Sequence, residues 1–465
     1  MKAPSWAPHL LALVLAALLS AAALVNPALP LAMVVGALAL GWMLSSPFHL
    51  ALMFCVVLFA RPSELLPALD SLSIPKLLAL ASIATFFLHR LFSRRIEATR
   101  SPFHPPMIAL TAAVFLSTQL GSDPTASMTL FTDSFVKILV VYVLLVHLVD
   151  RPSRVATTYL VMSITVAGMA VYSMYAKATG LILVEGSRAA YVGALGDPND
   201  FSLVLFMYLP FLIEATTHTR GLKRFGLGAL ALILIMGMAG TQSRGGFMGL
   251  SLALAVMFHD RGSLKLRLAA LPVGLVVILL LVVLSGAGER ESGAVGSGEI
   301  DESAQGRLDA WIAGGRMLMR HPFLGVGFGS FARNYESYCL NPVIWGQHET
   351  HNAYIKVAAE TGLAGFIPFM TLVLLTLREA VRLRAYAQRE SNALARSAMR
   401  AALPTACGFV LIAFFLSQSW SWYFYVMFGQ VAAMGVLRTN ALGAPDALRE
   451  EPQHSSFPVV RQRAA

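Results

Sequence analysis

Long apolar runs recur along the whole chain, and they constrain its fold more than any other feature. A transmembrane helix needs about 20 mostly apolar residues, because the hydrocarbon core of a bilayer is about 30 Å thick. About 14 runs reach or approach that length, near residues 8–25, 28–44, 48–60, 75–91, 106–119, 134–149, 156–176, 199–216, 226–240, 245–258, 267–285, 353–377, 401–417 and 421–437. Because 48–60 and 245–258 are short enough to be half-helices or re-entrant segments, we expect about 12 to 14 transmembrane helices. The sequence therefore predicts an all-α, polytopic membrane protein.

The composition also indicates a membrane protein. The chain is 57% hydrophobic and 13% charged, whereas soluble globular proteins average about 25% charged residues. Lys2 and the small residues that follow the first apolar run resemble a signal peptide, but membrane segments follow at once and need no cleaved leader. The three cysteines, Cys55, Cys339 and Cys407, indicate neither a structural disulfide nor a metal-ligand spacing.

Lysine and arginine gather on one side of the predicted membrane helices. If the runs alternate in direction, that side holds the C-terminal tail and the loops at 89–100, 150–154, 217–225, 259–267 and 378–400. Such an excess marks the cytoplasmic side, so we expect the N-terminus inside. The opposite side carries most of the acids, in the loops at 61–74, 120–133, 177–198, 241–244 and 286–352. The net charge of +10 therefore indicates orientation in a lipid bilayer and not nucleic-acid binding.

The chain divides by its membrane segments. We expect N-terminal transmembrane helices over 1–180, transmembrane helices with two arginine motifs over 181–285, one large outer loop over 286–352, C-terminal transmembrane helices over 353–437 and a cytoplasmic tail over 438–465.

The large outer loop has two parts. It starts Gly/Ser/Glu-rich, which is typical of a flexible segment. An amphipathic helix is then expected to end at His321-Pro322, with one face marked by Leu308, Trp311, Ile312, Met317 and Leu318. The glycines that alternate after it predict a tight turn with exposed backbone, at Gly325, Gly327 and Gly329.

Two arginines fall on the predicted outer side, where arginine is not favoured. Arg188 lies in GSRAAYVGALGDPNDF, just before a membrane run, and Arg244 lies in GTQSRGGFMGL, a tight connection between two runs. Charged side chains at the membrane boundary usually form ion pairs or bind a ligand. A guanidinium group can donate two parallel hydrogen bonds to the oxygens of a diphosphate. A snorkelling arginine at 188 and a plain tight turn at 244 are the simpler alternatives.

The segment after Arg188 looks like a helix N-terminus, with Asp197 or Asn199 as the cap beside Pro198. Free N–H groups and positive potential at such an end suit a phosphate. Asp197 and Asn199 are therefore candidate substrate-binding residues. Asp197 and Asp200 can also form a carboxylate group with Glu185, but capping and solvation explain these acids more simply.

A polar cluster, HETHNAYIK, begins at His348, where the large loop returns to the membrane. The imidazole of His351 can accept a proton from a hydroxyl in an aqueous vestibule, with Asn352 fixing its ring or Glu349 or Glu360 orienting it. His348 is a candidate helper or substrate-binding residue. A metal site is disfavoured because the spacing H-E-T-H is not that of HExxH. A solvated interfacial histidine is the simpler alternative.

Four aromatic residues lie close together before the last run, at Trp420, Trp422, Tyr423 and Tyr425. Such a cluster is typical of an aromatic belt at a membrane interface. A groove for lipid or sugar is the alternative.

Together these residues resemble a known family. His351-Asn352, nine intervening residues, Gly362, two more and Gly365 match the H-[N/S/Q]-x9-G-x2-[G/T/Y] pattern of bacterial O-antigen ligases. The QSRGG stretch around Arg244 and the segment GRLDAWIAGGRMLMRHPFLGVGFGSF are similar to the same superfamily, which also contains O-antigen polymerases and protein O-oligosaccharyltransferases. The resemblance is strongest over about residues 185–370.

The resemblance implies a multi-spanning, inverting GT-C-type glycosyltransferase in the bacterial inner membrane, with a periplasmic active site and no metal or other cofactor. Its donor would be a glycan on undecaprenyl diphosphate. Arg188 and Arg244 would grip the diphosphate, and His351 would act as a base toward the acceptor hydroxyl or orient it. Two guanidinium groups stabilise a diphosphate leaving group, so no general acid is required.

The choice within the superfamily rests on the loops. Ligases show one large periplasmic loop and polymerases two; here 286–352 is long while 177–198 is modest. This favours an O-antigen ligase of lipopolysaccharide biosynthesis, with lipid A–core oligosaccharide as acceptor. A protein O-oligosaccharyltransferase and a polymerase are the alternatives. A lipid-linked glycan transporter is the alternative of another class, and it would spread its charges along a central axis.

Overall fold

The computed structural model describes residue 41 and residues 46–66, 73–93, 99–259, 302–340 and 349–443. The predicted membrane runs at 8–25 and 267–285, and all of 28–44 except residue 41, lie outside these ranges. So do His348, the flexible start of the large loop and most of the predicted cytoplasmic tail.

The described residues form helices and no strands, and each predicted apolar run among them coincides with a helix. These helices are α3 (Pro47–Ala60), α5 (Ile74–Ser93), α6 (His104–Leu120), α8 (Val136–Leu148), α9 (Pro152–Ala178), α10 (Pro198–His218), α11 (Gly221–Thr241), α12 (Arg244–His259), α17 (Ala353–Tyr386), α18 (Ala393–Ala413) and α19 (Trp422–Gly443). Six helical spans in this part of the chain are long and apolar enough to cross a membrane. The prediction of an all-α, polytopic membrane protein is confirmed.

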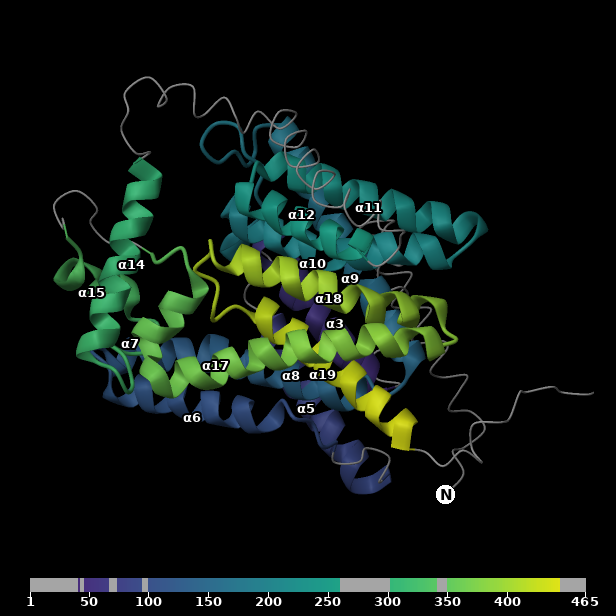
Figure 1. The fold of residues 1–465 in the computed structure, drawn as a ribbon, viewed down its shortest axis with the longest axis horizontal. Coiled ribbons are helices and arrows are strands. Elements are labelled where there is room, and N and C mark those ends of the chain that lie inside the picture. The colour runs from purple at the N-terminus through teal and green to yellow at the C-terminus, as the bar shows by residue number, and fades with distance from the viewer. Residues whose placement is uncertain are drawn as a thin grey trace, which may run out of the picture.

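Shorter elements connect these helices. They are α4 (Pro62–Leu65), α7 (Pro124–Leu130), the π-helical turn η2 (Phe131–Phe135), η3 (Gly193–Leu195), α14 (Glu302–Arg320), α15 (Phe331–Tyr338) and η4 (Ala387–Arg389). Figure 1 shows the long helices side by side, with α7, α14 and α15 gathered at one end of the bundle, on the left of that view. We call this the capped end.

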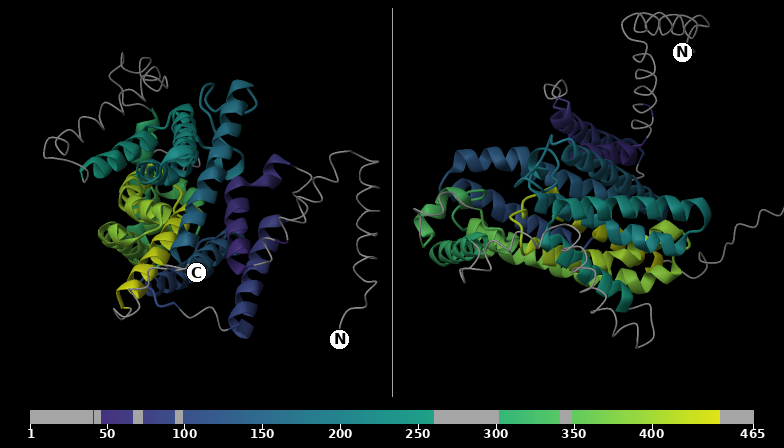
Figure 2. Two further views of the ribbon diagram at one scale, coloured as in Figure 1. Left: turned by 90° about the vertical axis from the view of Figure 1, so that its right-hand side faces the viewer. Right: turned by 90° about the horizontal axis from the view of Figure 1, so that it is seen from above.

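Helix α10 lies at the centre of the bundle. It packs against α9, α11, α12 and α18, and every residue from 200 to 212 is buried. Helix α5 lies at the periphery, where its large apolar side chains are exposed, including Leu80, Leu91 and Phe92. Figure 2 shows α5 at the edge of the molecule in both further views. Apolar side chains on the outside as well as in the core are what a bundle surrounded by lipid tails requires.

The predicted amphipathic helix of the large loop is confirmed as α14, and its predicted apolar face is buried only in part. Met317 on that face is fully buried, whereas Leu308 and Ile312 are exposed. The small residues Ala310 and Ala313 are buried as well. The reason is close packing against α17: a methyl group added at Gly314 would overlap the side chain of Ile355. Small residues thus form much of the contact face.

The predicted glycine turn is confirmed, because Gly325, Gly327 and Gly329 all have positive φ, which favours glycine.

The prediction of an aromatic belt before the last membrane run is wrong, because Tyr423 and Tyr425 are fully buried. They face the core because α19 packs against α8 and α17, not against the edge of the bundle.

Candidate active site

Arg188 is buried in the loop that joins α9 to α10, and neighbouring segments hold its guanidinium group. Nε donates a hydrogen bond to the carbonyl oxygen of Thr241 at the end of α11, at 2.9 Å. Nη2 donates to Oδ1 of Asn199 in the first turn of α10, at 2.8 Å. Nη1 lies 3.4 Å from Oε1 of Glu185. These bonds fix the plane of the guanidinium at the start of α10.

The loop around Arg188 is anchored to two other helices. The amide of Ala189 donates to the carbonyl of Gly240 in α11, at 2.8 Å. The hydroxyl of Tyr191 donates to the carbonyl of Ala60 at the end of α3, at 2.7 Å. Burial raises the pKa of Tyr191 to about 12, so this hydroxyl remains a donor at neutral pH. The anchored loop holds Arg188 in place.

Arg244 lies on the adjoining segment, as the first residue of α12, and its side chain is exposed. The turn before it depends on Gln242, which adopts the left-handed conformation with φ 53°. The hydroxyl of Ser187, next to Arg188, donates to Oε1 of Gln242 at 3.1 Å. The two predicted arginines are therefore on segments in direct contact at the same end of the bundle.

His351 lies in a turn just before α17 and has φ 46°, a conformation that is uncommon for a residue other than glycine. Its backbone N–H donates to Oγ of Ser417 at 2.7 Å. Oδ1 of Asn352 caps α17 by accepting hydrogen bonds from two backbone N–H groups in the first turn of the helix. One of them is the N–H of Tyr354, at 3.0 Å. On the other side, Glu349 accepts a bond from Nζ of Lys356 at 2.6 Å. The turn that carries the histidine is thus held at both ends.

The glycines of the histidine motif have a structural role in α17. Gly362 has φ 59° and ψ −162°, so the helix is broken there. The N–H groups of Leu363 and Ala364 donate instead to the carbonyls of Pro322 and Phe323, at 2.8 and 3.1 Å. A Cβ at position 362 would overlap the backbone of Phe323. The motif therefore brings the loop after α14 against α17.

Glu360, two residues before the break, joins this loop to the opposite side of the site. Its Oε1 accepts from the N–H of Phe331 at 3.0 Å, and its Oε2 accepts from the indole N–H of Trp420 at 2.5 Å. Its backbone carbonyl accepts from the N–H of Gly327 at 3.1 Å and from the hydroxyl of Ser117 at 2.6 Å. The carboxylate is fully buried, and its bonds are structural.

The bridging loop, residues 414–421 between α18 and α19, connects the histidine to the start of α10. Ser417 accepts the hydrogen bond from the N–H of His351. Its neighbour Gln418 donates from its side-chain amide to Oδ2 of Asp200, in the first turn of α10. The bridging loop therefore contacts both the turn that carries His351 and the start of α10, which holds Arg188.

The bridging loop also lies beside Arg244. A methyl group on Gly245 would be 3.5 Å from Cβ of Phe415, which is ordinary van der Waals contact. Arg188, Arg244 and His351 are thus on segments that meet at the bridging loop, at the end of the bundle where α10, α12 and α17 begin. No two of them are on opposite ends of the bundle.

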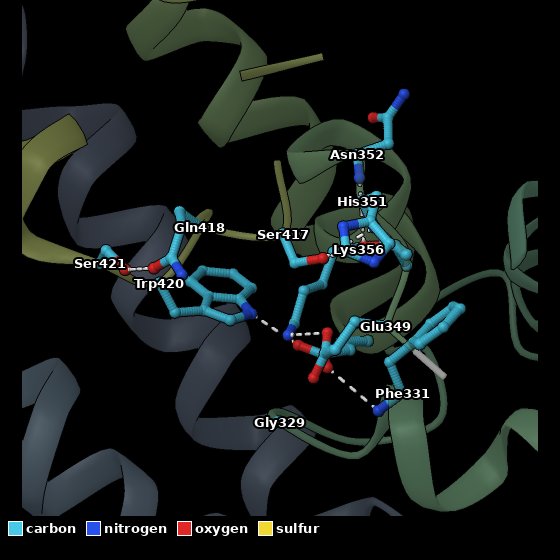
Figure 3. A network of polar contacts seen from close by, with 12 residues as sticks. Gly329, Phe331, Glu349, His351, Asn352, Lys356, Ser417, Gln418, Trp420 and Ser421 are labelled. Atoms are coloured by element: carbon cyan, nitrogen blue, oxygen red, sulfur yellow. Dashed lines mark hydrogen bonds and ion pairs between the residues drawn. The ribbon is translucent and has the colours of Figure 1, made fainter. Parts of the chain in front are cut away.

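A group of charged residues lies beneath the histidine turn. Lys356 is within electrostatic range of three carboxylates, Asp200, Glu349 and Glu360. Figure 3 shows Lys356 and Glu349 between Trp420 and Phe331, with Ser417 beside His351. Because Lys356 bonds directly to Glu349, the pair fixes the residue that begins the turn.

The remaining predicted residues have these positions. Asp197 is the N-cap of α10, and its Oδ1 accepts from the N–H of Asn199 at 2.7 Å, as the predicted helix start requires. Asn199 holds Arg188, and Asn352 caps α17 while its Nδ2 has no hydrogen-bond partner in the described part of the chain. His348 lies outside the described residues.

Sequence reasoning missed the polar residues that join the two halves of the site. Lys356 is a charge near the start of an apolar run, and Ser417 and Gln418 are polar residues at the boundary of two such runs. Those interruptions are the signal that points to them, because polar groups at such depths are costly unless they are paired. Asp200 showed no distinct signal, since an acid in a first helical turn is ordinary.

Comparison with models of known protein families gives a match to part of the chain. Residues 229–370 match the family model described as O-antigen ligase. This match, over less than a third of the chain, supports a protein of the O-antigen ligase/polymerase superfamily. The matched range includes Arg244, α14, the His351 turn and the break at Gly362. A search of curated proteins found no match to the chain. Together with the six apolar helical spans of the described residues, the match supports a multi-pass membrane enzyme of the ligase and polymerase type.

Proposed function

We propose that this O-antigen ligase family protein transfers a glycan from undecaprenyl diphosphate to a hydroxyl of the lipid A–core oligosaccharide, at the periplasmic face of the inner membrane. The observation that supports this most is the meeting of three segments at the bridging loop. They carry two arginines, suited to a lipid diphosphate, and one histidine, suited to a hydroxyl. A shared end of the bundle favours transfer over transport, since a transporter would place its charges along a central axis.

The donor diphosphate would be gripped at the starts of α10 and α12. Arg188 is held by Thr241 and Asn199 with its guanidinium plane fixed, and Arg244 is exposed at the first residue of α12. Planar guanidinium groups bind phosphate oxygens in pairs. The N-termini of these two helices add positive potential. This arrangement suits a leaving group on which negative charge increases.

His351 would serve the acceptor. The acceptor oxygen forms a bond to the anomeric carbon while its proton passes to the imidazole. The bond from that carbon to the diphosphate breaks, and the electron pair stays on the diphosphate oxygen. A single displacement inverts the anomeric centre, and two guanidinium groups stabilise the leaving charge. No step of this reaction requires a metal ion.

The acceptor assignment follows from the loops. One long loop and a modest second one favour a ligase that uses lipid A–core. A protein acceptor would make the enzyme a protein O-oligosaccharyltransferase, and a growing glycan as acceptor would make it a polymerase. The identity of the glycosylated product distinguishes these alternatives from the ligase.

The test is incubation of purified protein with a glycan on undecaprenyl diphosphate and, in parallel, lipid A–core or a hydroxyl-bearing peptide. The expected product is glycan on lipid A–core, with release of undecaprenyl diphosphate and an inverted anomeric centre. His351→Ala, Arg188→Ala and Arg244→Ala are each expected to abolish transfer while the protein inserts and folds. Full activity of His351→Ala would exclude the base role, and the absence of transfer to any acceptor would refute the proposed function.

A further inference from the structure

Two large apolar side chains at the end of α14 are strongly exposed. Met319 is 80% exposed in the last turn of the helix, and Phe323 is 77% exposed in the loop that follows it. We call residues 319–324 the 319–324 turn. Neighbouring apolar side chains that are exposed together mark surfaces that meet a membrane or a partner. This turn is therefore expected to contact an apolar environment.

Backbone hydrogen bonds hold this turn against α17. The N–H of Leu363 donates to the carbonyl of Pro322 at 2.8 Å. The N–H of Ala364 donates to the carbonyl of Phe323 at 3.1 Å. Leu363 is itself 41% exposed, and Ile367, one turn further along α17, is 59% exposed. Because residues four apart share one face of a helix, the backbone of Phe323 lies next to the outward face of α17.

The length of the apolar part of α17 indicates the depth of this contact. No charged residue occurs over residues 361–377, between Glu360 and Arg378. At about 1.5 Å per residue this stretch is about 25 Å long, which is less than the hydrocarbon thickness of about 30 Å. The whole stretch is therefore needed to cross the hydrocarbon, and Leu363, near one end of it, lies about 5 Å inside the boundary. Phe323 lies level with Leu363 and hence at a similar depth.

Helix α14 has the orientation and the charge distribution of a helix at a membrane surface. Figure 1 shows α14 crossing the direction of α17 at the capped end. Its last cations contact α15: Nη1 of Arg316 donates to the carbonyl of Tyr338 at 2.9 Å, and the guanidinium of Arg320 lies 5.5 Å from the centre of the Tyr338 ring. Met319 and Phe323 stay exposed. Helices in the plane of the interface insert their apolar side chains by about 5–10 Å and keep their cations at the polar surface.

The same helix contacts the candidate site. The indole N–H of Trp311 in α14 donates to the carbonyl of Thr350, which precedes His351, at 3.0 Å. The ring of Trp311 also packs edge-on against Phe414, the first residue of the bridging loop, with 5.2 Å between ring centroids. The position of α14 relative to the membrane therefore determines the height of the histidine turn.

We propose that the 319–324 turn is inserted into the bilayer leaflet at the capped end, where lipid acyl chains cover Met319 and Phe323. The turn then anchors α14 to the membrane and, through Trp311, holds the His351 turn at a fixed height above the hydrocarbon. Continuity with the outward face of α17 favours acyl chains over a second protein as the partner. The inference does not depend on the proposed function, because neither donor nor acceptor takes part in this contact.

The experiment measures the depth of nitroxide labels in phosphatidylcholine vesicles that contain no donor or acceptor. Cys339 and Cys407, the free cysteines that are not buried, are first replaced by serine. Single labels are attached at Phe323→Cys or Met319→Cys. Power saturation then compares their contact with O₂, which enters the lipid, and with a water-soluble nickel chelate. We expect both labels about 5–10 Å inside the hydrocarbon boundary.

Two further labels calibrate the measurement. Ile367→Cys on the outward face of α17 is the control in lipid, and Ser337→Cys, exposed on α15, is the control in water. Labels at positions 319 and 323 that the chelate reaches as readily as position 337 would overturn the inference. Labels that neither O₂ nor the chelate reaches would also overturn it, because protein would then cover the turn.

A pair of variants tests whether the insertion depends on an apolar side chain at position 323. Phe323→Asp places a short charged group in the hydrocarbon, where charge is costly, whereas Phe323→Leu stays apolar. With the label at Met319→Cys, we expect the chelate to reach the aspartate variant and not the leucine variant. Equal shielding in the two variants would contradict the anchoring role. A wild-type protein that transfers no glycan refutes the proposed function but leaves these depths unchanged.

Discussion

The break in α17 at Gly362 predicts a large effect for a small substitution, Gly362→Ala. The observed φ of 59° with ψ of −162° is a region that side-chain-bearing residues essentially do not adopt, and it costs about 1–3 kcal/mol. The added Cβ would also overlap the backbone of Phe323, so the loop must move away. Two hydrogen bonds, from Leu363 and Ala364, are then lost, at about 1 kcal/mol each. The expected destabilisation is about 3–5 kcal/mol.

The measurement is thermal unfolding of the purified protein in one detergent. At about 2 °C for each kcal/mol in a large domain, we expect the midpoint of Gly362→Ala to fall by about 6–10 °C. Gly315→Ala is the matched control, because Gly315 is exposed in α14 with open space around it. Alanine there gains helix propensity of about 1 kcal/mol, so its midpoint is expected to stay the same or rise. Equal midpoints for the two variants would refute the structural explanation of the motif.

Three further predictions follow from the site. Arg188→Lys is expected to lower kcat/KM by about 10²-fold in the transfer assay, because lysine cannot reproduce at least two charged hydrogen bonds of about 1.5 kcal/mol each; near-normal kcat/KM would contradict this. Asn352→Ala is expected to destabilise the protein by about 1 kcal/mol and Asn352→Asp by less, since aspartate also caps helices; equal thermal midpoints for the two variants would refute the capping role. Excess chelator is expected to leave the transfer rate unchanged, whereas a loss that Mg²⁺ restores would indicate a metal-dependent reaction.

The membrane helices could be predicted from the sequence because burial in lipid has a simple signature. Apolar runs long enough to span determine where helices lie, and their breaks determine where the loops fall. The glycine turn at residues 325–329 was also predictable, because alternating glycines indicate positive φ. The buried face of α14 was predictable only in part, since the contact with α17 buries small residues beside Met317 and leaves Leu308 and Ile312 exposed. Hydrophobicity alone therefore does not identify the whole buried face of that helix.

For the site, the sequence could indicate its charged residues but not the way they are joined. Arg188, Arg244 and His351 stand out because each interrupts the expected pattern at a membrane boundary. Their arrangement depends on the bridging loop, whose contacts with His351 and Asp200 span more than 60 and 200 residues of sequence. Such long-range pairing leaves no local pattern, so the contact between Gln418 and Asp200 is evident only in the folded chain.

The most direct test of the proposed site is a cryo-electron microscopy map of the protein with a glycan on undecaprenyl diphosphate bound. The predicted map has the diphosphate in contact with the guanidinium groups of both Arg188 and Arg244, and the first sugar between them and the imidazole of His351. A diphosphate bound away from both arginines, or a first sugar remote from His351, would contradict the proposal.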